Sequence, residues 1–92
     1  MEMEILKIDD TIEKVSNGEK FVKIEELYKA IDTDMVECVY LNDGKILVID
    51  EEGKLKGKPL NEQATLLMHE SLGNRNDCIV GVAVLIDRKY FD

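Results

Sequence analysis

The apolar positions of the chain follow a strand period at its start and a helical period soon after. Apolar and acidic residues alternate over Met1–Ile5, which predicts a strand over Met1–Ile8 with one buried face. Thr11–Asn17 has no clear period, and "EKFVKI" (Glu19–Ile24) predicts a short strand after a turn. In "IEELYKAID" (Ile24–Asp32) the apolar residues share one helical face, so this segment predicts a helix.

A β-hairpin is the clearest local feature of the sequence. Two β-rich segments, Met35–Leu41 and Lys45–Asp50, flank the turn residues Asn42-Asp43-Gly44. A short glycine-containing loop between two such segments is typical of a tight hairpin. The first of the two strands has apolar residues in both alternating sets, which predicts a central strand covered on both faces.

A second helix and a last strand complete the pattern. Glu51–Lys58 is polar and predicts a loop, and Asn61 is a good N-cap for a helix that Gly73 would end. The apolar segment Cys78–Asp87 predicts a buried central strand, with Gly81 at a close approach or a bulge.

The order of these elements predicts the fold class. It reads strand, short strand, helix, hairpin, helix and strand, with Arg88–Asp92 as a tail. This order indicates a single α+β domain over residues 1–92, with a mostly antiparallel sheet of four to five strands and two helices packed on one face. A chain of 92 residues forms a modest core, so a deep cavity would need a second copy as another wall.

Charge narrows the possible partners. The net charge of −8 argues against direct nucleic-acid binding, because phosphate backbones require a basic surface. Residues 1–52 hold fifteen acidic and six basic residues, whereas residues 53–92 hold five acidic and six basic ones. The acidity of the first half serves either solubility or the binding of a basic protein.

Catalytic and metal chemistry have little support in the sequence. Cys38 and Cys78 lie in apolar segments, where a thiol is protonated and unreactive, and His69 has no partners at metal-ligand spacing. We therefore expect no enzyme activity, no metal and no cofactor. The first residues are acidic and the longest apolar run, Ile79–Ile86, is too short to cross a membrane. A cytoplasmic protein with reduced thiols is expected.

The one candidate binding site is a lysine-rich segment before the second helix. A P-loop is excluded, because Gly53 and Gly57 are spaced one residue too close and Pro59 replaces the hydroxyl residue. If the segment is extended, its three lysines share one side and precede the free amides of a helix N-terminus, which suits an anion. The alternative is a solvated charged loop. The candidate ligand-binding residues are Lys54, Lys56, Lys58, Asn61, Thr65 and Arg75.

Three motifs carry a family resemblance. "LNDG" (Leu41–Gly44), "EEGKLKGKPLNEQAT" (Glu51–Thr65) and "IVG" (Ile79–Gly81) resemble a small domain of unknown function found in bacteriophages, plasmids and other mobile elements. The resemblance covers about half of the chain, Tyr40–Gly81. Before it, Asp32-Thr33-Asp34 replaces a Gly-Gly step typical of the family. The resemblance implies a compact α+β domain of mobile-element origin and brings no catalytic residues.

Two inhibitory functions are compatible with this origin, and a housekeeping or structural accessory protein of the mobile element is a third possibility. The first is a non-enzymatic counter-defence factor that sequesters a small anionic, nucleotide-type ligand, with the site formed in a homo-oligomer. The alternative is an inhibitor that binds a host protein through an acidic, DNA-like face. The residues of that face would be Glu13, Glu19, Glu25, Glu26, Asp32 and Asp34.

Overall fold

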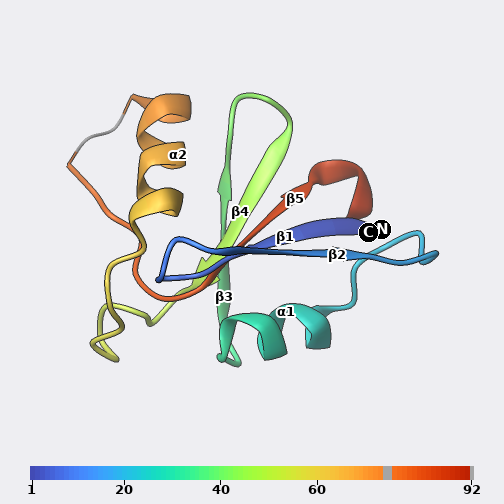
Figure 1. The fold of residues 1–92 in the computed structure, drawn as a ribbon, viewed down its shortest axis with the longest axis horizontal. Helices are drawn as coiled ribbons and strands as arrows, with labels where there is room; N and C mark the ends of the chain where they lie inside the picture. Colours follow the sequence, from blue (N-terminus) through green and yellow to red (C-terminus); the bar gives the residue numbers. More distant parts are fainter. Residues whose placement is uncertain (74–75, 92) are drawn as a thin grey trace.

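The computed structural model describes residues 1–73 and 76–91, which form one sheet, two α-helices and a short 3-10 helix (Figure 1). The elements are β1 (Glu2–Leu6), β2 (Ile12–Ser16), α1 (Ile24–Ile31), β3 (Val36–Tyr40), β4 (Lys45–Asp50), α2 (Glu62–Leu72), β5 (Ala83–Asp87) and η1 (Arg88–Tyr90). The sheet has the order β2-β1-β5-β4-β3, and each neighbouring pair is antiparallel. The expected α+β class and antiparallel sheet are confirmed.

The two helices pack on opposite faces of this sheet (Figure 1). The core on one face comprises Met1, Met3, Ile5, Leu27, Ile31, Ile46, Val48, Val84 and Ile86, with Leu27 and Ile31 from α1. The core on the other face comprises Leu6, Leu41, Leu47, Ala64, Met68, Ile79, Ala83 and Leu85, with Ala64 and Met68 from α2. The expectation that both helices cover one face is therefore wrong. β4 and β5 are apolar at consecutive positions, so both of their faces need a cover.

The second strand lies earlier in the chain than expected. β2 occupies Ile12–Ser16, within the segment that shows no clear period, and Glu19–Ile24 contains no strand. The turn before β2 is fixed by Asp9, whose Oδ1 accepts hydrogen bonds from the amide and the hydroxyl of Thr11 at 3.0 and 2.6 Å. This local bond, and not a hydrophobic period, sets where β2 begins.

β5 is a central strand of the sheet, whereas β3 is an edge strand. β5 lies between β1 and β4, as expected for an apolar segment, although it is shorter than Cys78–Asp87. β3 pairs with β4 alone among the described residues, so the expectation of a central strand there is wrong. The predicted tail is also partly wrong, because Arg88–Tyr90 forms η1 and the rings of Tyr90 and Phe91 pack against the α1-side core.

Asn61 joins α2 to the centre of the sheet. Its Oδ1 accepts a hydrogen bond from the amide of Ala64 at 3.1 Å, which caps the helix as expected. Its Nδ2 donates to the carbonyls of Leu6 and Gly81 at 2.8 and 2.9 Å. The side chain is fully buried. Gly81 has a φ of +77°, and a Cβ at this position would lie 2.8 Å from Cδ of Lys58, which confirms the predicted close approach.

Replacement of Asn61 by alanine is expected to lower the free energy of unfolding by about 2–4 kcal/mol. The change removes the helix cap and leaves two buried carbonyl groups without a donor. Urea denaturation at neutral pH measures the effect. Glu70→Gln, an exposed change on the same helix, is the control and is expected to stay within about 0.5 kcal/mol of the wild type. An Asn61→Ala variant as stable as this control would contradict the assignment.

Candidate functional site

The lysine-rich segment folds into consecutive turns and is not extended. The amide of Gly53 donates to the carbonyl of Asp50 at 3.1 Å, that of Lys56 to Glu52 at 3.0 Å, and that of Lys58 to Gly53 at 3.0 Å. Successive side chains therefore do not alternate between two sides, as they would in a strand. The strip of three lysines on one side, which depended on an extended backbone, does not form.

The ammonium groups of the three lysines go to two different carboxylates. Lys54 forms an ion pair with Asp77. The Nζ atoms of Lys56 and Lys58 lie 2.9 and 2.8 Å from Oδ2 of Asp50. The structure thus brings Lys56 and Lys58 together and leaves Lys54 apart from them.

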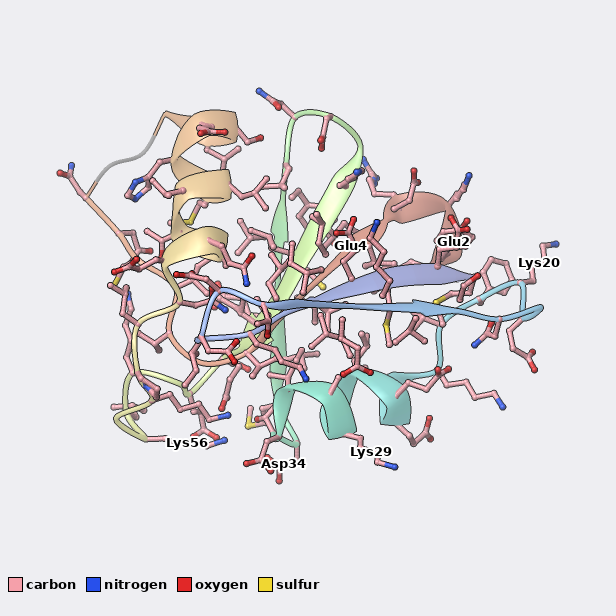
Figure 2. All side chains as sticks on the ribbon, viewed as in Figure 1. Glu2, Glu4, Lys20, Lys29, Asp34 and Lys56 are labelled. Atoms are coloured by element: carbon pink, nitrogen blue, oxygen red, sulfur yellow. The ribbon has the colours of Figure 1, made fainter. Side chains whose placement is uncertain are left out.

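Lys58 also closes the end of α1. Its Nζ donates to the carbonyls of Ile31 and Asp32 at 3.0 and 2.9 Å. These carbonyls lie at the C-terminal end of the helix, where a positive charge is favourable. Lys56 lies on the same side and donates to Oγ1 of Thr33 at 3.1 Å. Figure 2 shows Lys56 close to Asp34 below the start of β3.

Asp50 is the buried centre of this cluster. It is 4% exposed, and burial alone would raise its pKa. Hydrogen bonds from Lys58 and Lys56, from the amide of Glu52 and from the hydroxyl of Thr33 outweigh burial and hold the pKa of Asp50 well below its ordinary value. The hydrogen bond to Asp50 raises the pKa of Lys56 in turn. The cluster is therefore an ionised internal network.

The other predicted ligand residues have internal partners as well. Asn61 is the buried link described above. The hydroxyl of Thr65 accepts from the amide of Ile79 at 2.9 Å and donates to its carbonyl at 3.3 Å, which fixes α2 against the segment before β5. Arg75 lies outside the described residues. Binding of an anion by these residues stays a prediction, and the described members of the set have structural contacts that such binding would have to share.

The residues of the predicted acidic face come from β2, from α1 and from the segments that flank α1, and whether they bind a partner stays a prediction. Glu13 lies on β2, at the opposite edge of the sheet from β3, and pairs with Lys7 at 3.1 Å. Glu26 accepts the amide of Lys23 at 3.1 Å at the start of α1. Asp34 is exposed next to β3. Other carboxylates lie near β3, because the end of β4 pairs with the start of β3. They belong to Glu51 and Glu52, which follow β4.

His69 and the cysteines show ordinary surroundings. Nε2 of His69 lies 2.7 Å from the carbonyl oxygen of Asp77. Cys38 and Cys78 are free and half-buried, and burial, with a smaller contribution from Glu37, raises the pKa of the Cys38 thiol. Within residues 1–73 and 76–91, no three His, Cys, Asp or Glu side chains are grouped as metal ligands. The same residues include no helix long and apolar enough to span a bilayer.

A hollow of about 350 Å³ lies on the sheet near the start of β1. Its lining includes Glu4, Lys14, Lys45 and Asp87, and in the sheet register Glu4 is opposite Lys14 and Lys45 is opposite Asp87. Glu2 and Glu4 are labelled at this place in Figure 2. Opposite charges on neighbouring strands balance one another, so this hollow has no excess charge of either sign to select a ligand.

A smaller hollow of about 150 Å³ lies beside β3, on the α2 side of the sheet. Its lining residues are Glu37, Val39, Ile49, Asp50, Glu51, Lys54, Leu55, Met68, Asp77, Cys78, Ile79 and Val80. No local pattern in the sequence indicates this site, because the fold brings its lining together from β3, β4, α2 and two loops. The one hint in the sequence is Leu55, an apolar residue within a polar loop. The structure leaves its side chain 87% exposed, which is typical of a contact surface.

Asp50→Asn is expected to lower the free energy of unfolding by about 2–4 kcal/mol at neutral pH, because two lysines lose their counterion. The folded pKa of Asp50 lies below the unfolded one of about 3.9, so the stabilisation is fully present above that pH and is lost as the pH falls toward the folded pKa. The difference between wild type and variant should therefore shrink below about pH 4. Urea denaturation at a series of pH values measures it, with Glu70→Gln as control. A difference that does not change with pH would contradict the ionised network.

Comparison with models of protein families matches most of the chain. A family described as Domain of unknown function (DUF3846) matches residues 3–90. No curated protein and no solved structure is significantly similar to the chain. The family match includes all the strands and helices described above except the first residue of β1. The chain therefore belongs to the DUF3846 family of domains of unknown function.

Proposed function

We propose that this protein acts by binding, without catalysis, and that it holds a basic, extended segment of a partner protein along the free edge of β3. The carrying observation is that β3 is an edge strand surrounded by carboxylates. We further propose that the chain is a phage or mobile-element factor and that its partner is a host protein. The resemblance of Tyr40–Gly81 to domains of mobile elements supports this part of the proposal.

The hydrogen bonds of the hairpin define which backbone groups of β3 are free. Leu41 donates to the carbonyl of Lys45 at 2.9 Å, and Glu51 donates to that of Met35 at 3.0 Å. Residues of an antiparallel pair alternate between bonded and non-bonded positions. Leu41, Val39, Glu37 and Met35 therefore bond to β4. By the same alternation, the backbone N–H and C=O groups of the other residues of β3 point away from β4. These residues are Val36, Cys38 and Tyr40.

β3 has little of the protection that edge strands usually carry. Lysine, proline and bulges commonly prevent an edge from pairing with another chain. The opposite edge, β2, contains Glu13 and Lys14, whereas β3 contains Glu37 as its one charged residue. Tyr40 is 58% exposed. The edge is thus open to an added strand, a recognised mode of peptide binding.

The charge around β3 favours a basic partner. Asp34, Glu37, Glu51 and Glu52 lie in or beside the first half of the hairpin. With Asp50 and Asp77 they make six carboxylates, against the three lysines of the loop and Arg88, whose guanidinium lies 5.5 Å from the centre of the Tyr40 ring, a local balance of −2. A basic segment would be attracted and oriented by this field. A second copy, with a net charge of −8, would be repelled.

Capture of a small anion at the lysine loop has less support. It would require Lys56 and Lys58 to turn away from a carboxylate that is 4% exposed, and Lys58 to leave the end of α1. An ionised Asp50 without these partners would be a buried unpaired charge, which is strongly unfavourable.

A synthetic decapeptide of alternating lysine and valine is a suitable probe for the proposed edge. Its binding to the full chain should protect the amides of Val36, Cys38 and Tyr40 from hydrogen exchange, as followed by NMR. An alternating glutamate–valine peptide is the control and should protect none of them. Protection of β2 instead, or of no strand, would contradict the proposal. A concentration-dependent dimer with protected β3 amides would identify a second copy as the occupant and would also contradict it.

Tyr40 offers a matched pair of variants. The amide of Tyr40 faces outward, so Tyr40→Pro removes a donor for the added strand and no bond to β4. Tyr40→Ala removes the same ring and keeps the amide. We expect the proline variant to bind the lysine–valine peptide about tenfold more weakly than the alanine variant, from the lost hydrogen bond and the bulk of the ring. Equal affinities of the two variants, both with wild-type circular dichroism, would contradict strand addition.

A further inference from the structure

The hollow beside β3 forms part of the same surface as the free edge. Glu37 and Val39 of β3 line it directly, and they point to the α2 side of the sheet. In a strand added to β3, alternate side chains would point to that same side. One of them would therefore reach the mouth of the hollow.

The lining of the hollow combines an apolar floor with a charged rim. The floor is formed by Val39, Ile49, Met68, Ile79 and Val80. The rim contains Glu37, Glu51 and Asp77, together with Lys54. Asp77 is already paired with Lys54, whereas Glu37 and Glu51 take part in none of the ion pairs that the described residues form. Two carboxylates of the rim are thus available to a partner.

We infer that this hollow selects a lysine or arginine side chain of the added strand. Such a side chain has an apolar stem, which would lie on Val39 and Ile49, and a cationic end, which would reach Glu37 and Glu51. The chain itself shows this chemistry at the same place, since Lys54 lines the hollow and places its ammonium group on Asp77. The exposed Leu55 at the rim would cover the stem. This inference rests on the proposed binding of a strand to β3.

The experiment uses peptides that differ by one residue. A host peptide of alternating threonine and valine is made as a series in which a single lysine occupies each threonine position in turn, and a matched series carries norleucine. Norleucine has a similar apolar stem without the charge. We expect lysine at one position to raise the affinity about fivefold over norleucine at that position, because the rim is exposed and screened by solvent. Equal affinities at every position would overturn the inference.

Charge reversal in the protein tests the same contact from the other side. Glu37→Lys combined with Glu51→Lys should abolish the preference for lysine and favour a glutamate peptide instead. Glu70→Lys with Glu62→Lys, an equal change in net charge on exposed positions of α2, should keep the lysine preference. Loss of the preference in both double variants would show a general charge effect and would overturn the selective hollow. Circular dichroism and thermal melting confirm that each variant is folded.

The two levels of the proposal fail in different ways. If the amides of Val36, Cys38 and Tyr40 are protected and no position prefers lysine, strand addition stands and the selective hollow is wrong. If those amides are not protected by any peptide, the proposed function itself is wrong.

Discussion

A single buried carboxylate, Asp50, imposes the constraint around which this domain is arranged. An ionised group that is 4% exposed requires partners, and Lys56 and Lys58 supply them from a loop that immediately follows β4. Lys58 extends the same contact to the last carbonyls of α1, and its side chain passes over Gly81, where a Cβ would collide with it. One ion cluster thereby fixes three parts of the chain: the loop after β4, the end of α1 and the segment around Gly81 that precedes β5.

This use of the lysines determines where charge remains on the surface. The positive groups of the loop are directed inward, to Asp50, and across to Asp77. The carboxylates of Glu37, Glu51 and Glu52 keep no such partners among the described residues. The surface around β3 is therefore acidic, although the sequence around Lys54 is basic. The sign and the position of the local charge depend on which charged side chains the fold brings into ion pairs. The amino-acid composition does not reveal these pairs.

Local signals in the sequence predicted much of the fold. The hairpin, both helices, the cap at Asn61 and the close approach at Gly81 follow from turn and cap residues whose effect is local. The side of the sheet that each helix covers depends on long-range packing, and it was predicted wrongly. The extended strip of three lysines was predicted wrongly for the same reason, whereas anion binding at these residues stays a prediction. Its ion pairs join residues far apart in the chain, such as Lys54 and Asp77, and no spacing rule reports them.

Nitrogen-15 NMR of lysine side chains tests the central claim most directly, since it observes the ammonium groups themselves. The account predicts that Lys56 and Lys58 give slowly exchanging signals coupled to the Asp50 carboxylate. Lys29, which is exposed on α1 (Figure 2), should exchange rapidly. Rapid exchange at all three lysines would show that the loop is free in solution and would contradict the inward-facing cluster.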